Sequence, residues 1–214
     1  LGGVWYFSSP ISAIIEQTTH QEVATIEPVD VGQFFMIGHW TNTPTEVTAN
    51  LIETYGFGGV VIMDAPEDYV LLSNWIEQWN EVSDIPLLIA IDQEGGPVTR
   101  LKDSDFIQTG QKDILTTEQS YEVGQMRGKE LAALGITMNF APVLDIAYNP
   151  TSFMYSRTFP NSNQTDTLAA AMIAGMKVED VVAVPKHFPG HDDNELDSHY
   201  ILPAIYIDES ELDD

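Results

Sequence analysis

Short apolar segments alternate with helical patterns along most of this sequence, and this alternation limits the possible folds more than any other feature. Residues 86–91 are apolar on both faces, as the interior strands of a parallel sheet must be. Residues 45–55 instead have helical spacing, and Gly56 follows where a helix C-terminal cap belongs. The predicted strands are residues 33–38, 59–63, 86–91, 136–140 and 181–184, and the predicted helices are residues 45–55, 67–82, 116–135 and 165–178.

Strands that alternate with helices predict an α/β fold in which helices cover a parallel sheet. Such a sheet is either open and doubly wound or closed into a (β/α)₈ barrel. An open sheet usually has a glycine-rich phosphate loop after its first strand, but Gly38-His39-Trp40-Thr41 is no such loop. Polar residues recur after the third, fourth and fifth predicted strands, which favours the mouth of a barrel built from many loops.

The length of the chain conflicts with a complete barrel. Five strand–helix units are predicted in 214 residues, whereas a barrel has eight units in about 250 residues. We therefore expect a TIM-type (β/α)₈ barrel truncated after about five units, with the domain at residues 32–214 and incomplete at its C-terminus. Its open strand edges and apolar lining predict self-association.

Residues 1–31 are expected to be a leader, or the end of an export or anchor segment, ahead of this domain. They begin with the apolar residues 1–7, which are too few to span a bilayer and have no basic flank. This weak signal favours a protein that is exported or membrane-anchored, with a cytoplasmic location as the alternative.

The chain is strongly acidic, with 33 Asp and Glu against 8 Lys and Arg and a formal net charge of −25. Such a surface repels phosphate backbones and anionic lipids, so neither a nucleic acid nor a membrane surface is expected as a partner. A salt-adapted source is one hypothesis for this charge. Cysteine is absent, which excludes disulfides, thiolate metal sites and cysteine nucleophiles.

The loop after the last predicted strand carries the strongest chemical signal. Residues 186–199 contain one lysine and three of the five histidines in the chain. Asp197 lies two residues before His199, close enough to hydrogen-bond the imidazole and to bias its tautomer and pKa. This is the usual construction of a histidine general acid/base. Lys186 and His187 stand where the strand ends, facing whatever fills the barrel mouth.

Two earlier loops supply further walls for the same site. Asp92 and Arg100 follow the third predicted strand, and Asp145 and Arg157 follow the fourth. Each has a structural alternative: an aspartate after a strand can cap a helix, Asp145 can bridge loops, and Arg157 can tie two loops through a salt bridge. In so acidic a chain, cations in loops are expected to be paired or to bind ligand.

Several aromatic residues and histidines are expected to be structural. Trp75 and Trp79 lie four apart on a predicted helix, which favours the core over a sugar-binding platform. His20 and His39 are interpreted as ordinary surface or core histidines.

Four motifs in this sequence resemble a known enzyme family. They are Asp92-Gln93-Glu94-Gly95-Gly96 with Val98 and Arg100, Ala141-Pro142-Val143-Leu144-Asp145, Ser156-Arg157-Thr158-Phe159, and Lys186-His187-Phe188-Pro189-Gly190-His191 leading to Asp197-Ser198-His199. From about residue 32 to the end, the chain resembles the barrel domain of glycoside hydrolase family 3, in its bacterial β-N-acetylglucosaminidase branch. The last motif is the most specific of the four.

This resemblance implies a retaining, exo-acting β-N-acetylglucosaminidase that needs no cofactor or metal. It implies that His199 is the acid/base and that Asp197 orients it. The terminal N-acetylglucosamine, from peptidoglycan- or chitin-derived saccharides, would be held by Asp92, Arg100, Arg157, Lys186 and His187.

The sequence departs from the family pattern in three ways. The aspartate nucleophile of the family follows a later strand, so it is expected beyond the chain end and this segment alone is expected to be inactive. Asp192 and Pro160 each stand where the family usually has glycine.

Two other functions remain open at this point. The first is a metal-dependent hydrolase, since His187, His191, Asp192, Asp193 and His199 are possible oxygen and nitrogen ligands. The second is a non-catalytic sugar-binding fragment.

Overall fold

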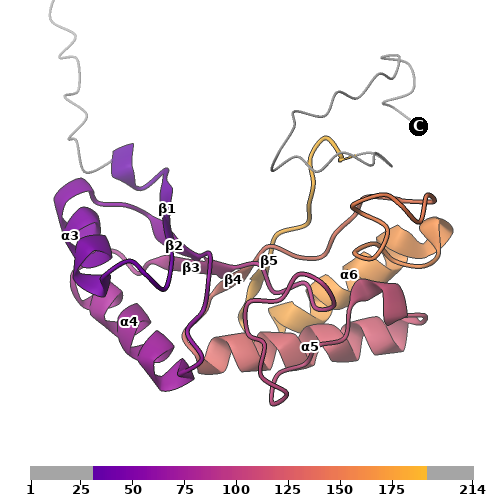
Figure 1. Cartoon of the computed structure of the whole chain (residues 1–214), viewed down its shortest axis with the longest axis horizontal. Coiled ribbons are helices and arrows are strands. Elements are labelled where there is room, and N and C mark those ends of the chain that lie inside the picture. The colour runs from indigo at the N-terminus through magenta and orange to yellow at the C-terminus, as the bar shows by residue number, and fades with distance from the viewer. Residues whose placement is uncertain (1–30, 192–214) are drawn as a thin grey trace, which may run out of the picture.

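A computed structural model describes residues 31–191. These residues form one parallel sheet whose five strands lie side by side in chain order (Figure 1). The strands are β1 (Met36–His39), β2 (Gly59–Ile62), β3 (Leu88–Ile91), β4 (Met138–Asn139) and β5 (Val182–Ala183). Sequential parallel strands joined by helices are the construction of a TIM-type barrel, so the predicted α/β class is confirmed.

A helix precedes each strand from β2 to β5. The helices are α3 (Thr45–Tyr55), α4 (Tyr69–Glu81), α5 (Thr117–Ala133) and α6 (Thr165–Lys177), with single 3₁₀ turns at Gln111–Asp113 and Ser162–Gln164. Figure 1 shows α5 and α6 lying alongside each other. In the part of the chain that is described, no helix is both long and apolar enough to cross a membrane.

Local signals set the helix ends. Gly56 has φ 61° and donates its N–H to the carbonyl of Ile52, as a left-handed cap does. The Thr116 hydroxyl accepts the Gln119 N–H at 3.2 Å, and the Gln119 side chain accepts the N–H of Leu115 at 3.0 Å. The predicted start of α5 is confirmed, although the return bond reaches one residue further back than in a regular capping box.

The first strand begins later than predicted. Residues 33–35 were expected to open it, but Phe34 and Phe35 donate their N–H groups to Val31 and Gly32 and form a turn. The side chain of Phe34 is 87% exposed. The apolar run therefore predicted a strand that is too long at its start, because its two aromatic residues do not enter the core.

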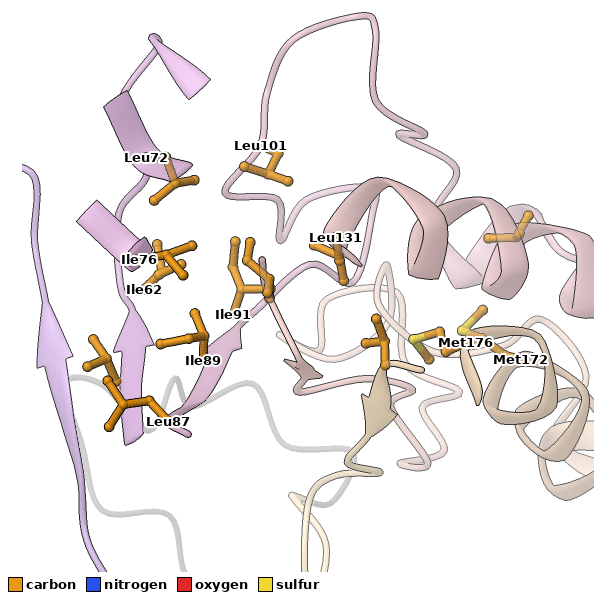
Figure 2. Close-up of a cluster of buried hydrophobic side chains, with 14 of the residues drawn as sticks. Ile62, Leu72, Ile76, Leu87, Ile89, Ile91, Leu101, Leu131, Met172 and Met176 are labelled. Atoms are coloured by element: carbon orange, nitrogen blue, oxygen red, sulfur yellow. The ribbon is translucent and has the colours of Figure 1, made fainter. Parts of the chain in front are cut away.

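The core lies between the sheet and its helices. Ile62, Ile89 and Ile91 are fully buried on the strands, and Leu72, Leu131 and Met176 pack toward them from α4, α5 and α6 (Figure 2). Each such side chain contributes about 1.5–3 kcal/mol by leaving water.

Helices α5 and α6 touch through glycines. A Cβ atom at Gly124 would lie 2.2 Å from the carbonyl oxygen of Met172, and one at Gly175 would lie 2.2 Å from that of Tyr121. Only glycine permits this approach of the two backbones. The close packing fixes the helices that flank β4, and so fixes the loop that follows it.

Parallel register brings the strand ends to one edge of the sheet. Ile91 pairs with Asn139, and Asn139 pairs with Ala183. Beyond these strands, Val143 and Lys186 form one further parallel bridge. The loops after β3, β4 and β5 therefore meet, as expected from the positions of their polar residues.

Candidate active site

Lys186 connects the loop after β5 to the loop after β3. Its ammonium nitrogen lies 2.6 Å from Asp92 Oδ1 and 2.6 Å from Glu94 Oε1. The backbone of Lys186 is fixed as well, since it donates its N–H to the carbonyl of Pro142 at 3.0 Å. A cation held by two carboxylates at this position can donate a hydrogen bond to a ligand without changing place.

Glu94 and Arg157 form the most buried ion pair of this region. Arg157 Nε donates to Oε2 at 3.0 Å and Nη2 donates to Oε1 at 2.7 Å. The two side chains are only 2% and 7% exposed. Charges buried this deeply are stable only when paired with good geometry, so the two-pronged contact holds both loops in one arrangement.

Asp145 accepts three hydrogen bonds, two from His187 and one from His191. His187 Nδ1 lies 2.6 Å from Asp145 Oδ2, and the His187 N–H donates to the same oxygen at 3.1 Å. The other carboxylate oxygen accepts the N–H of His191. With Nδ1 as donor, His187 Nε2 is the acceptor, and it lies 3.4 Å from Arg157 Nη2.

These hydrogen bonds also set the charge of Asp145. Burial alone would raise its pKa, but the His187 side chain, the His191 N–H and the His187 N–H outweigh burial and hold the pKa below its usual value. Asp145 therefore stays ionised at neutral pH, and it fixes the His187 ring.

These side chains surround a cavity of about 560 Å³, here called the first cavity. Its polar wall comes from the loops after β3, β4 and β5, and its apolar surface includes Phe140, Val184 and Phe153. Arg157 also lies over the Phe153 ring, 4.9 Å from its centroid. An apolar floor with a few convergent polar groups is typical of a small-molecule site.

The loop after β3 is held by buried amide side chains. Asn139 accepts the Gln93 N–H and donates to the Gln93 carbonyl, both at 3.0 Å. The Gln93 side chain accepts the N–H groups of Arg100 and Leu101 at 2.9 and 3.0 Å. Gln93 thereby places Arg100 beside Asp92, with Nη2 3.5 Å from Asp92 Oδ2.

A fully buried arginine on helix α5 supports the loop after β3. Arg127 on α5 donates to the carbonyl of Thr109 at 2.8 Å. Burial lowers its pKa to about 10, against the raising influence of Glu130 and Glu94. Gly95 lies directly over it, with φ 80° and with room for no Cβ, which would meet Arg127 Nη2 at 2.6 Å.

The structure brings five predicted site residues together and leaves two outside its range. The first cavity is lined by Asp92, Arg100, Arg157, Lys186 and His187. His199 and Asp197, predicted as acid/base and orienting residue, lie outside the described residues.

Other residues that build the site were not among the predicted catalytic and substrate-binding residues. Glu94 pairs with Arg157 and Lys186, and it could have been found as the second acid of its motif. Asp145 acts by holding His187, the bridging alternative named for it. Asn139 and Arg127 carry no comparable signal, because nothing local in the sequence shows what they touch.

The predicted metal set is largely beyond what the structure describes. His187 and His191 line the first cavity, whereas Asp192, Asp193 and His199 lie outside residues 31–191. Within that range, no group of three His, Asp or Glu side chains is placed to hold an ion.

Comparison with known proteins agrees with this geometry. Residues 18–214 match the glycosyl hydrolase family 3 N-terminal domain. The chain is 33% identical over 187 residues to β-hexosaminidase A of Pseudoalteromonas piscicida, covering 80% of this chain and 31% of that protein. It is 39% identical over 135 residues to the β-hexosaminidase of Psychromonas ingrahamii, covering 59% of this chain and 40% of that protein. The chain thus spans less than half the length of these relatives.

Solved structures give the same result. The family 3 β-N-acetylglucosaminidase of Paenibacillus sp. str. FPU-7 superposes with a TM-score of 0.74 at 34% identity, covering 87% of this chain and 37% of that one. NagZ of Neisseria gonorrhoeae, in complex with N-trifluoroacetyl-D-glucosamine, superposes with a TM-score of 0.74 at 26% identity, covering 83% and 56%. The strands follow the order of a barrel, and residues of the family motifs line the first cavity. Together with the match over residues 18–214, this shows that the chain belongs to glycosyl hydrolase family 3 and carries its N-terminal domain.

Proposed function

We propose that the protein to which this chain belongs is an exo-acting, retaining β-N-acetylglucosaminidase that removes terminal N-acetylglucosamine from peptidoglycan- or chitin-derived saccharides. The observation that carries this proposal is the first cavity, where Asp92, Glu94, Arg157 and Lys186 are already paired and partly or fully buried. Relatives named β-hexosaminidase and β-N-acetylglucosaminidase support the same activity.

The charges of the first cavity suit a neutral sugar. Asp92 and Glu94 can accept hydrogen bonds from sugar hydroxyls, while Lys186 and Arg157 can donate to hydroxyl or acetamido oxygens. Each acid already faces a cation, so a neutral ligand leaves no charge unpaired when it displaces water.

The chemical step is assigned to groups outside the described residues. His199 would protonate the glycosidic oxygen as an aspartate nucleophile attacks the anomeric carbon, which forms a glycosyl-enzyme and releases the aglycone. His199 would then take a proton from water as the water attacks that carbon and frees the aspartate. Asp197 would hold the imidazole in the tautomer that these transfers need.

The test is hydrolysis of aryl N-acetyl-β-glucosaminides by the full-length protein. His199→Ala should lower kcat/KM, which reports the glycosylation step, by at least about 100-fold with a phenol of high pKa as leaving group, and much less with dinitrophenol, which departs without an acid. The matched control is Lys129→Ala, since Lys129 is exposed on α5, and it should change nothing.

Three results would contradict the proposal. Wild-type protein that binds N-acetylglucosamine without hydrolysing the aryl substrate would make it a non-catalytic sugar-binding protein. Activity abolished by a chelator and restored by a divalent cation would favour the metal-dependent alternative. Equal losses of kcat/KM for both leaving groups would remove His199 from the role of general acid.

A further inference from the structure

A second cavity of about 760 Å³ lies beside the first at the same edge of the sheet. Its walls come from the loops after β1, β2 and β3 and from the first two turns of α4. Its lining includes Thr41, Asp64, Tyr69, Leu71, Trp75 and Arg100. The four family motifs contribute a single residue to the lining of this cavity, and that residue lines the first cavity as well.

That shared residue is Arg100, which lines both cavities. Arg100 is therefore common to the walls of the two cavities. Its guanidinium is poorly paired: Nη2 lies 3.5 Å from Asp92, and within residues 31–191 its Nε has no partner. A side chain 32% exposed, with one long contact, retains donors for a ligand.

The lining of the second cavity combines aromatic and acidic groups. Tyr69 and Trp75 contribute ring surface, and Asp64 contributes carboxylate oxygens. Trp79 is fully buried, as predicted, but Trp75 is only half-buried and lines this cavity as well as packing on the core. Ring faces pack against the C–H face of a pyranose while carboxylates accept hydrogen bonds from its hydroxyls.

We propose that the second cavity binds the sugar unit linked to the N-acetylglucosamine in the first cavity, so that the enzyme recognises at least a disaccharide. This inference rests on the proposed function. It adds that Arg100 donates hydrogen bonds to the ligand where the two cavities meet. Tyr69 and Trp75 then form the wall against which the second sugar unit packs.

The test compares binding of N-acetylglucosamine with binding of its thio-linked β-1,4 dimer, which resists hydrolysis, to the full-length protein by calorimetry. The informative variant is Leu71→Arg, which places a long side chain at the wall of the second cavity, where Leu71 is 40% exposed on α4. The matched control is Leu51→Arg, because Leu51 is 37% exposed on α3 and lines neither cavity.

We expect the dimer to bind at least about 10-fold more tightly than the monosaccharide, which corresponds to about 1.4 kcal/mol. Leu71→Arg should remove most of that gain and leave monosaccharide affinity within twofold, whereas Leu51→Arg should affect neither. If the monosaccharide binds and the dimer gains nothing, or if Leu71→Arg leaves the gain intact, the second subsite is refuted and the proposed function stands. If neither sugar binds, both fall together.

Discussion

The two cavities at the carboxyl edge of the sheet differ in how their walls are held. Around the first cavity, short ion pairs join loops that are far apart in the chain, such as Lys186 to Asp92 at 2.6 Å. Around the second, the described contacts are longer or more exposed, such as Arg100 to Asp92 at 3.5 Å and the exposed hydrogen bond of the Thr41 hydroxyl to Asp64 at 2.7 Å. The first cavity is therefore preorganised, whereas the walls of the second are held by weaker contacts.

The largest effect is expected from Lys186→Met, which leaves Asp92 and Glu94 without their shared cation. Affinity for N-acetylglucosamine should fall at least about 100-fold, and stability should fall by roughly 3 kcal/mol because a buried acid loses a partner. Calorimetry and urea unfolding measure the two. Lys129→Met on the exposed face of α5 is the control, and Lys186→Arg should recover stability more than affinity. If Lys186→Met behaves like the control, the first cavity is not held by ion pairs.

Arg157→Lys should have the next largest effect. The substitution keeps the charge but removes the two-pronged contact with Glu94, so kcat/KM should fall about 10- to 100-fold. Steady-state kinetics of the full-length protein measure this. An unchanged kcat/KM would show that a positive charge beside Glu94 is sufficient and that the two-pronged contact is not needed.

Asp145→Asn should have a moderate, pH-dependent effect. Because the folded pKa of Asp145 is lowered, its stabilising contribution is present above about pH 4 and is lost as the pH falls through the folded value. Wild type should therefore exceed the variant in unfolding free energy at about pH 6, and the gap should shrink toward about pH 3. A gap that is constant with pH would mean that the carboxylate charge is not what holds His187.

His39→Gln tests the core beneath the second cavity. His39 is fully buried, and its ring lies edge-on to Trp75 and Trp79, with centroids 5.0 and 4.7 Å away. Burial lowers its pKa, so the stability associated with the neutral ring is complete above about pH 6.5 and declines as the pH falls below it. Between about pH 7.5 and pH 5.5 the Tm of wild type should drop about 2–4 °C more than that of the variant. Parallel pH profiles would contradict a buried neutral His39.

The smallest effect is expected from Thr41→Val. The hydrogen bond between Thr41 and Asp64 is exposed, so its loss should change stability by less than about 0.5 kcal/mol. Urea unfolding measures the change. A loss comparable to that of Lys186→Met would abolish the contrast between the two cavities.

The sequence predicted those parts of the fold that depend on local signals. Helix α3 has the predicted bounds, and Gly56 caps it, because a glycine after helical spacing fixes its own conformation. Residues 33–35 were assigned wrongly to β1, since apolar character does not reveal whether a side chain reaches the core. The five sugar-binding candidates could be predicted to meet because parallel strands end at one edge.

The pairing within the site could not be predicted. Glu94 and Arg157 are 63 residues apart, and the path of the loop between β4 and α6 decides whether they meet. The same holds for Asp145, whose two alternatives, cap or bridge, differ only in where the loop after β5 passes. Long-range geometry of irregular loops carries no periodic signal that a sequence can show.

The most direct test of a preassembled site is a structure of the full-length protein with N-acetylglucosamine bound. We predict the sugar in the first cavity, with its hydroxyls within hydrogen-bond distance of Asp92, Lys186 and Arg157 and with those side chains unmoved. A sugar bound elsewhere, or a first cavity whose ion pairs must break to admit it, would contradict preassembly.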